Sequence, residues 1–443
     1  MQFKSFISML LLFSLGCHVQ AQVRQFDISA GNNSIIRTID SGRSLIYTEE
    51  FNTTTASFLL YHDGQTSAFS FQVPPGIQVR DVRIYDNSVA YFCGTYNGGS
   101  SAVVGMFSIN GVFLGAMPIY YALINWTNDD MIKPTDLKRL DIFTTPTDSV
   151  CMAMVGDAIF DNTNPFPTTT VVSAHFNGAI WDIHSIVRKP SESRFTDIAC
   201  LDDMIVVAAS DTNGQGCFVK TFHPTHDFPA HPFTPQQLYG IVYGNAVGDV
   251  LITKLFGNTA VVAHYDVSSG VSTVFHRVAF NSISGHHAVP TDTWTTSPLS
   301  TMPYGNTWTM MELLSDGSNN NLLQHAQYPI LPILSTYDWL VSFSLPVSIS
   351  TTATAWQPSI CKHHSLDWDA ASSQPRTSGC APKLTTYGTT WHPLCSQRFS
   401  LTLQYNTATK STEKIVEYSN NISTFTHTVL PTIKNISVST LCE

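Results

Sequence analysis

The feature that most constrains the fold is a unit of two short apolar strands that recurs about every 45 to 60 residues. Each copy begins with an acidic residue, runs through an apolar strand and a small polar turn, and enters a second apolar strand. Copies begin at Asp81, Asp141 and Asp197, and a looser copy begins at Asp249. Because a unit of this size buries its apolar face only against its neighbours, the repeat indicates a solenoid, a propeller or an array.

Dipeptides typical of tight turns lie between further apolar runs. They are Asp63-Gly64, Asn110-Gly111 and Asn177-Gly178, and they readily adopt the positive φ that two-residue hairpins require. Each unit is therefore interpreted as two successive hairpins, or four strands. The sequence predicts an all-β chain, a β-propeller of about six to eight four-stranded blades with seven as the best fit. A pair of β-sandwich sheets is the alternative.

Composition agrees with an all-β chain that works outside the cytoplasm. No stretch keeps an apolar period of 3.6 residues, so few helices are expected. Charged residues make up 12% of the chain, against roughly 25% in typical soluble domains. Solubility must then come largely from Ser, Thr and Asn, which suits an extracytoplasmic surface.

The N-terminus predicts export. An apolar run from Phe6 to Leu15 is too short to cross a bilayer. Val19 and Ala21 are small residues at the positions that signal peptidase reads, so residues 1–21 are interpreted as a signal peptide cleaved after Ala21. The expected location is secreted, periplasmic or at the cell surface. The competing hypothesis is a lipid anchor on Cys17, which Ser14 disfavours because leucine is usual at that position.

The charge balance excludes some partners. The formal net charge is −10 and no basic stripe is present, which argues against nucleic acid because such binding depends on neutralising phosphates. No later segment has the roughly 18 uninterrupted apolar residues of a membrane helix, so no integral membrane span is expected. The expected partner is an unknown extracytoplasmic protein or glycan.

This interpretation divides the chain into four parts. Residues 1–21 are the signal peptide and residues 22–345 are the propeller repeats. Residues 346–398 are rich in Cys, His and Trp and are expected to form a loop or an insertion. Residues 399–443 are expected to supply C-terminal strands that close the propeller.

Eight cysteines remain after cleavage, and their positions suggest two different states. Disulfide candidates are Cys361, Cys380, Cys395 and Cys442, for which two bridges are expected with the pairing left open. Cys93 and Cys151 lie in or beside apolar strands, where a free buried thiol is expected.

Motifs for catalysis and for metal binding are missing. The sequence contains no G-x-S-x-G elbow, no Gly-rich phosphate loop and no H-E-x-x-H helix, so no catalytic residue and no cofactor are assigned. His363 and His364 lie near cysteines, but their spacing fits no standard zinc site and a disulfide-stapled loop is favoured over a metal. The leading acids either form a carboxylate ring in a central channel or satisfy backbone donors at strand starts, and the second interpretation is favoured.

One stretch carries a family resemblance. Val89-Ala90-Tyr91-Phe92-Cys93-Gly94 followed by Val104-Gly105-Met106-Phe107, together with the export signal, resembles secreted bacterial repeat proteins of propeller type whose function is undefined. The resemblance implies no activity and no catalytic residue. The sequence therefore favours an exported non-enzymatic propeller that binds a glycan, peptide or protein through rim loops. The alternative is a carbohydrate-active hydrolase or lyase with paired carboxylates in the central pocket, because propellers host both.

Overall fold

The computed structural model describes the chain in segments: residues 34–40, 43–49, 56–62, 69–119, 122–123, 131–144, 150–160, 166–176, 178–187, 194–202, 205–210, 216–222, 243–244, 246–266, 272–280, 288–295, 309–315, 321–330, 335–344, 362–369, 374–382, 395–406 and 411–419. These segments contain strands and turns but no helix. No helix that could cross a membrane occurs in them.

The first four sheets follow one another along the chain. Sheet 1 contains β1 (Ser34–Asp40), β2 (Arg43–Glu49), β3 (Ala56–His62) and β4 (Phe69–Gln72). Sheet 2 contains β5 (Ile77–Tyr85), β6 (Val89–Tyr96), β7 (Ser101–Ser108) and β8 (Phe113–Ile119). Sheet 3 contains β10 (Met131–Thr144), β11 (Val150–Phe160), β12 (Phe166–Phe176) and β13 (Trp181–Val187), with the short β9 (Ala122–Leu123) paired to β10. Sheet 4 contains β14 (Arg194–Cys200), β15 (Ile205–Ser210), β16 (Gly216–Phe222) and β17 (Tyr243–Gly244).

Three further sheets complete the set. Sheet 5 contains β18 (Ala246–Phe256), β19 (Thr259–Asp266), β20 (Ser272–Phe280) and β21 (Ala288–Thr295). Sheet 6 contains β22 (Thr309–Ser315), β23 (Asn321–Ile330) and β24 (Ser335–Ser344). Sheet 7 contains β25 (Lys362–Asp369), β26 (Gln374–Pro382), β27 (Cys395–Asn406) and β28 (Ser411–Ser419).

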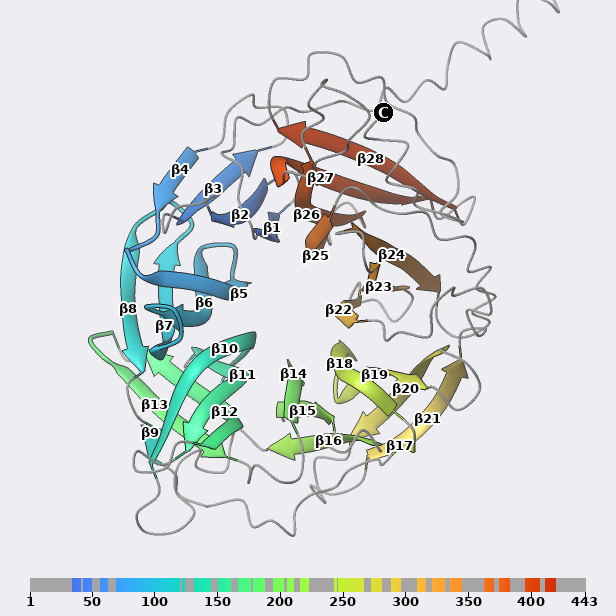
Figure 1. Cartoon of the computed structure of the whole chain (residues 1–443), viewed down its shortest axis with the longest axis horizontal. Helices are drawn as coiled ribbons and strands as arrows, with labels where there is room; N and C mark the ends of the chain where they lie inside the picture. The colour runs from blue at the N-terminus through green and yellow to red at the C-terminus, as the bar shows by residue number, and fades with distance from the viewer. Residues whose placement is uncertain are drawn as a thin grey trace, which may run out of the picture.

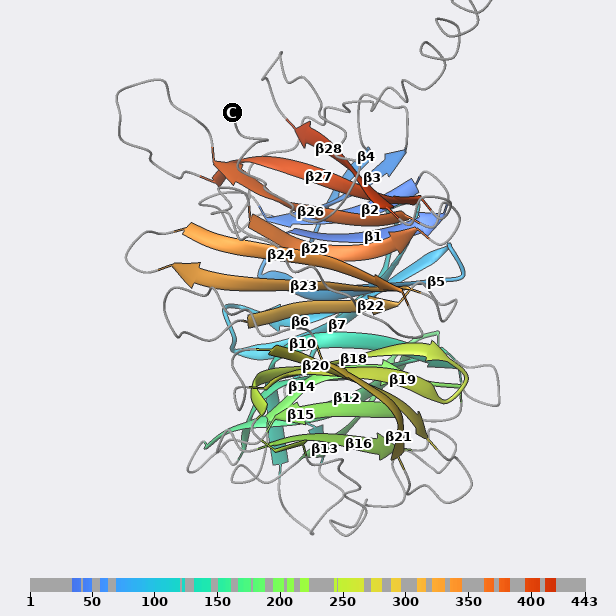
Figure 2. The ribbon, with the colours of Figure 1, turned by 90° about the vertical axis from the view of Figure 1, so that its right-hand side faces the viewer.

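The sheets stand in a ring around one axis, and the first long strand of each sheet, which is β10 in sheet 3, lies innermost (Figure 1). The side view shows the strands running mostly along that axis, from one rim of the ring to the other (Figure 2). All strand pairs within the described sheets are antiparallel. Radially repeated antiparallel sheets define a β-propeller, so the predicted fold class is confirmed. The seven sheets of the described segments agree with the expected six to eight blades.

The expected insertion at residues 346–398 needs a correction. Two strands of this region, β25 and β26, belong to sheet 7 and pair with each other and with β27. The apolar alternation that reveals a strand is missing from β25 because it carries polar residues such as Ser365 and Asp367. These two residues meet partners from sheet 1, so tertiary contacts rather than apolar burial on both faces specify this strand.

Apolar side chains fill the spaces between neighbouring sheets. Phe58 of sheet 1 packs against Phe107 of sheet 2 with ring centroids 4.4 Å apart, and Phe92 joins the same cluster. Separate clusters lie between sheets 2 and 3, between sheets 3 and 4, and between sheets 4 and 5. Fully burying one such side chain contributes about 1.5–3 kcal/mol, so the ring is held mainly by packing between blades.

A one-residue bulge recurs in the inner strands. The bulged residue is Arg80 in sheet 2 and Thr196 in sheet 4, whereas sheet 3 has two, Thr135 and Lys138. Close backbone approach beside two of these bulges requires glycine. A Cβ on Gly94 would lie 2.0 Å from the Gln78 carbonyl oxygen, and one on Gly156 would lie 2.1 Å from that of Asp136. The bulge sets which residues of the inner strand face the axis.

Chain direction separates the turns into two rims. In sheet 2 the turns after β5 (residues 86–88) and after β7 (residues 109–112) lie at one end, where Ile109 N donates to the Ser88 carbonyl. The turn at residues 97–100 lies at the other end, where Asn97 N donates to the Gly76 carbonyl. We call the first end rim A and the second rim B. The Asn110-Gly111 turn forms as predicted, with φ of 87° at Gly111.

Candidate functional site

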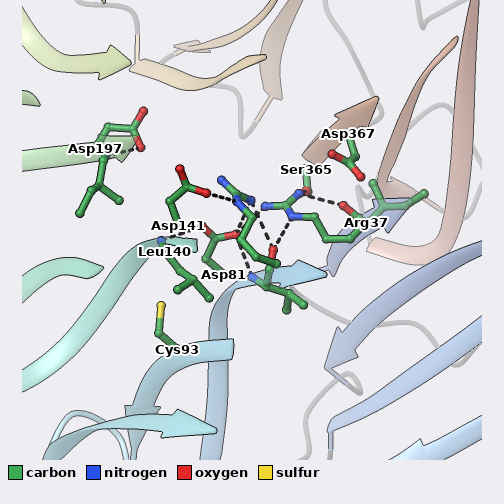
Figure 3. Close-up of polar contacts among 12 residues, drawn as sticks. Arg37, Asp81, Cys93, Leu140, Asp141, Asp197, Ser365 and Asp367 are labelled. Atoms are coloured by element: carbon green, nitrogen blue, oxygen red, sulfur yellow. Dashed lines mark hydrogen bonds and ion pairs between the residues drawn. The ribbon is translucent and has the colours of Figure 1, made fainter. Parts of the chain in front are cut away.

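An ionic cluster lies around the axis of the ring, and Asp81 is its most buried member (Figure 3). Asp81 Oδ1 accepts hydrogen bonds from Val82 N at 2.8 Å, from Arg37 Nη2 at 2.5 Å and from Arg83 Nη1 at 3.2 Å. Its Oδ2 accepts one from Leu140 N of the next inner strand at 2.9 Å. Both carboxylate oxygens are thus engaged, and one of them joins sheet 2 to sheet 3.

Two further aspartates repeat this arrangement. Asp141 accepts from Ile142 N at 2.9 Å and from Cys200 N of sheet 4 at 2.6 Å. Asp197 accepts from Ile198 N and from Ile252 N of sheet 5, both at 2.9 Å. Each carboxylate therefore bridges its own strand and the next inner strand. The prediction that these acids satisfy backbone donors is confirmed, although the donors lie mid-strand and on the neighbouring blade as well as on the same strand.

Arg37 connects three sheets. Its guanidinium donates from Nε to the Val82 carbonyl at 2.6 Å, from Nη2 to Asp81 and from Nη1 to Ser365 Oγ at 2.9 Å. The side chain is 6% exposed and Asp81 is fully buried. Figure 3 shows Ser365 and Asp367 of sheet 7 on the far side of Arg37 from Asp81. We call these residues the axial cluster: Arg37, Asp81, Arg83, Arg139, Asp141, Asp197, Ser365 and Asp367.

Arg83 carries positive charge among the acids of the axial cluster. Its side chain is 29% exposed, and its Nε lies 3.8 Å from Asp141 Oδ1. Burial opposes this charge, but Asp81, Asp141, Asp367 and Asp197 together raise the pKa of Arg83 above its ordinary value. A guanidinium at this place neutralises carboxylates that would otherwise repel one another across the axis.

The aspartates of the cluster differ in how they respond to burial. Burial alone would raise the pKa of Asp81, but Arg83, Arg37 and Arg139 lower it below its ordinary value. Burial raises the pKa of Asp141 despite Arg83, and it raises the pKa of Asp197 to about 6 against the opposing charge of Arg139. The acid farthest round the ring from Arg37 is therefore the one most easily protonated.

Strand register shows that the acids of the sequence repeat are not all equivalent. Asp81 and Asp197 directly follow the bulge of their strands, whereas Arg139 takes that position in sheet 3. Asp141 lies two residues later, where sheet 2 has Arg83. Residues two apart share one face of a strand, so the position after the bulge and the position two residues later both face the axis. Asp141 therefore holds a different position from Asp81 and Asp197, although the sequence repeat aligns the three acids. The fourth acid of the repeat, Asp249, lies in β18.

Sequence reasoning missed the arginines of the axial cluster. The signal was present, because Asp81 and Arg83, and likewise Arg139 and Asp141, are oppositely charged residues separated by one apolar residue. Such alternation places opposite charges on one face of a strand. Within the described segments, no group of three or more His, Cys, Asp or Glu side chains is suited to a metal ion.

Large apolar side chains are exposed on rim A. The exposed large hydrophobic residues of the described segments are Val112, Leu114, Ile180 and Phe256. Val112 and Leu114 lie in and just after the turn between β7 and β8, and Ile180 lies in the turn before β13. Phe256 ends β18, next to the turn that leads to β19. All four positions lie at rim A.

Three of these residues lie near the outer strands of sheets 2 and 3. A Cβ on Gly115 would lie 3.7 Å from Trp181 Nε1 and 3.8 Å from the Phe176 ring, so β8 runs beside these aromatic rings. Leu114 precedes Gly115 in the chain and Ile180 precedes Trp181. We call Val112, Leu114 and Ile180 the blade 2–3 patch.

The cysteine predictions have different outcomes. Cys93, Cys151 and Cys200 are buried thiols that form no disulfide, which confirms the expectation for Cys93 and Cys151. Cys361 and Cys442 lie outside the described residues, as do the predicted signal peptide, the cleavage position after Ala21 and Cys17. Cys380 and Cys395 lie on the paired strands β26 and β27 but not opposite each other, since Cys380 pairs with Arg398 and Cys395 with Pro382.

The radial sheets and the axial cluster define the class of protein as a β-propeller with polar connections between its inner strands. No family model and no curated protein matches the chain. Among solved structures, it is similar to Hsv2 from Kluyveromyces lactis, at 11% identity and a TM-score of 0.41 over 88% of this chain and 98% of that one. It is also similar to apo prolyl oligopeptidase B from Galerina marginata, at 7% identity and a TM-score of 0.46, over 89% of this chain and 52% of that one.

A protein of unknown function from Dyadobacter fermentans shows a similarity of the same order. Its identity is 7% and its TM-score is 0.40, over 73% of this chain and 96% of that one. Similarities this weak transfer no activity, ligand or partner to this chain. The fold assignment rests on the sheet topology.

Proposed function

We propose that this protein is an exported, non-enzymatic β-propeller that binds a glycan, peptide or protein partner through the loops of rim A. The observation that carries the proposal is the position of the exposed large hydrophobic residues. Every one of them in the described segments lies on rim A, and Ile180 and Val112 are 60% and 58% exposed. Exposed apolar side chains gathered on one face are typical of interaction sites.

The geometry of the axial cluster favours binding over hydrolysis. A glycosidase needs one carboxyl group free to donate a proton and a second free to attack or to activate water. In Asp81, Asp141 and Asp197, by contrast, both oxygens accept hydrogen bonds from backbone N–H groups or arginines. These carboxylates serve the connection between blades.

One observation favours the alternative of a carbohydrate-active hydrolase or lyase. The pKa of Asp197 is raised to about 6 by burial, and a raised carboxyl pKa is what a general acid requires. Release of reducing ends from a panel of polysaccharides by the full chain tests this alternative. Activity that Asp197→Asn abolishes would favour the enzyme, whereas binding without turnover would favour the proposed function.

The direct test of the proposed function is binding by the full chain on a glycan array and on an array of synthetic peptides. Reproducible binding that the triple change Val112→Ser, Leu114→Ser and Ile180→Ser weakens supports rim A as the binding face. Gln78→Ala is the control, because Gln78 is exposed near the start of β5 and therefore near rim B. Binding that the control weakens and the triple variant does not would contradict the proposal.

Export is part of the proposal, and it is supported by the apolar run and the small residues that precede Gln22. The intact mass of the protein recovered from the medium or periplasm tests it. A mature chain that begins at Gln22 is expected. A chain that begins at Cys17 with a diacylglyceryl group would show a lipid anchor instead.

A further inference from the structure

We propose that the pair formed by His264 and His276 makes the packing of sheet 5 on sheet 4 sensitive to acid, so that protonation of the pair loosens this part of the ring. The inference goes beyond the proposed function, because it concerns the interior of the propeller and not the face that binds a partner. Three features support it: the geometry of the pair, its place between two sheets and its apolar surroundings.

The two imidazole rings share one hydrogen bond. His264 Nε2 and His276 Nε2 lie 3.0 Å apart, and the rings are nearly parallel, with 7° between their planes and 5.1 Å between their centroids. At this distance one Nε2 donates its proton and the other accepts it through a lone pair. The bond therefore requires that the accepting ring be neutral, since a protonated imidazole has no lone pair to offer.

The pair belongs to the packing between sheets 4 and 5. Both residues are buried, at 3% and 6% exposure. Val262 precedes His264 by two residues and Val278 follows His276 by two, in a ladder without a register shift. Both valines belong to the apolar cluster shared with sheet 4. Residues two apart share one face of a strand, so the histidines lie on the face of sheet 5 that packs on sheet 4.

This environment disfavours positive charge on the pair. Burial and the charge of His264 lower the pKa of His276 from its ordinary value of 6.5 to about 3. The folded protein thus holds this proton less tightly than the unfolded chain does. The contribution of His276 to stability is therefore fully present above about pH 6.5 and is lost as the pH falls toward 3.

Protonation of both rings would replace an attractive contact by a repulsive one. Each ring would then carry an N–H at Nε2, and two positive charges would face each other across 3.0 Å. Val206 and Ala208 of β15 belong to the facing side of sheet 4, and apolar side chains cannot solvate such charges. The rings must separate to reach water, which loosens the contact between the two sheets.

Charged and titratable residues of the surrounding strands fall into two groups. Those of the first group lie on other faces or in contacts of their own: Arg277 and its register partner Asp292 on the opposite face of sheet 5, Lys254 with Asp202, Asp197 in the axial cluster, and Lys220 opposite Val207 of the cluster between sheets 3 and 4. Those of the second group are Arg194 in β14, Cys217 in β16, Asp249 in β18 and Asp266 in β19. An aspartate beside the pair would favour protonation, whereas burial opposes it, so the sign of the measured pH dependence separates the two causes.

The pH dependence of the free energy of unfolding tests the inference on the full chain. The wild type is compared with the double variant His264→Gln and His276→Gln, because Asp197 titrates in the same range with the opposite sign and its contribution cancels in the difference. Between about pH 6.5 and 4, unfolding of the wild type should take up about one to two protons more than unfolding of the double variant. The double variant His264→Leu and His276→Leu provides the same comparison with apolar side chains.

Single variants serve as controls. His175→Gln removes a histidine of sheet 3 whose side chain is 31% exposed, and it should leave the wild-type proton uptake unchanged. Asp249→Asn and Asp266→Asn should also keep the loss of stability in acid. Each series is measured with and without EDTA, because histidine side chains also bind metal ions.

Hydrogen exchange at pH 7 and pH 5, corrected for the intrinsic rates, locates the effect. Exchange in residues 205–210 and 259–266 should become faster at pH 5 in the wild type but not in the double variants, while residues 89–96 of sheet 2 stay protected. Equal proton uptake by the wild type and both double variants would overturn the inference, as would stability that rises in acid relative to them. An acid dependence that disappears with EDTA, or unchanged exchange in residues 205–210 and 259–266, would overturn it as well.

Discussion

Arg37 in the first strand donates a hydrogen bond from Nη1 to Ser365 Oγ in the last sheet, at 2.9 Å and across 328 residues of sequence. Beside it, Thr38 N donates to Asp367 Oδ2. Every described sheet is built from consecutive strands, so the first and last sheets share no strand and meet through side chains such as these. The ring is therefore closed by side-chain hydrogen bonds from Arg37 and Thr38 to Ser365 and Asp367, which we call the clasp. Arg37 is its central residue.

Replacing Arg37 by methionine should destabilise the protein strongly. The change removes the bonds to Ser365 and the Val82 carbonyl and leaves the buried Asp81 without its closest cation. Removing one partner of a buried ion pair lowers the free energy of unfolding by about 3–5 kcal/mol. The free energy of unfolding from urea titration measures the effect.

The control is Arg43→Met, which breaks an ion pair between an arginine and an aspartate in the same sheet. The side chains of Arg43 and Asp40 are 32% and 34% exposed, and exposed pairs contribute about 0–1 kcal/mol. If Arg37→Met lowers the free energy of unfolding no more than the control does, the clasp does not hold the ring together.

Asp197 should make stability depend on pH between about 4 and 6. Its pKa in the folded state is about 6, whereas an unfolded aspartate titrates near about 4. The folded state thus binds the proton more tightly in this window, and stability falls as the pH rises through it. Relative to Asp197→Asn, the free energy of unfolding of the wild type should fall by on the order of 2–3 kcal/mol as the pH rises across this window. Above the window, the difference between the two proteins should stay constant.

Asp81 provides the opposite case for the same measurement. Its pKa is lowered in the folded state, so its contribution is present above about pH 4 and is lost as the pH falls through the lowered value. Stability profiles of Asp81→Asn and Asp197→Asn should therefore diverge from the wild type in different pH ranges. Coincident profiles would refute the different environments of the two carboxyl groups.

The sequence predicted the propeller because its signal is local. Apolar strands, the Asn110-Gly111 turn and the repeat of Asp81 and Asp197 each depend on a few neighbouring residues, and the structure places these acids on inner strands. Only the first two strands of the last sheet, β25 and β26, were missed, because β25 is polar. Its Ser365 and Asp367 contact Arg37 and Thr38, and no property of residues 346–398 alone reveals a partner more than 300 residues away.

The candidate site was predictable only in part, for a related reason. Asp81, Asp141 and Asp197 were recognised, but which of them follows a bulge depends on pairing with the second strand. The bulge before Arg139 is visible only in the register of β10 and β11. The blade 2–3 patch joins β8 to the turn before β13, and the packing of Gly115 on Trp181 that brings them together is a tertiary contact.

The two glycines beside the bulges should not tolerate a methyl group. Gly94→Ala and Gly156→Ala would each place a Cβ about 2 Å from a carbonyl oxygen, which forces the inner strand to shift. Overpacking costs about 1–3 kcal/mol and occasionally more. Melting temperatures of both variants should fall clearly below that of Gly115→Ala, whose Cβ meets ordinary contacts. Equal melting temperatures for the three variants would argue against the bulge geometry.

The strand thiols should resist alkylation in the native protein. Burial raises the pKa of Cys151 to about 11 and raises those of Cys93 and Cys200 above their ordinary value, and the thiolate is the reactive form. Treatment with iodoacetamide at neutral pH should leave these three unmodified until urea is added. Modification of any of them in the folded protein would show that its strand opens.

For the C-terminal cysteines we propose at least one disulfide among Cys361, Cys380, Cys395 and Cys442, because an exported chain meets an oxidising environment. Peptide mapping without reductant should recover a linked pair from this set. Four alkylated thiols in that map would refute the bridge.

Hydrogen exchange read out by mass spectrometry tests the central claim most directly, by comparing the free full chain with the chain saturated by the glycan or peptide that binds most tightly on the arrays. The account predicts slower exchange in residues 109–114 and 178–183 of rim A and no change in residues 97–100 of rim B. Protection confined to rim B or to the inner strands around Asp81 and Asp197, with residues 109–114 and 178–183 unchanged, would contradict it.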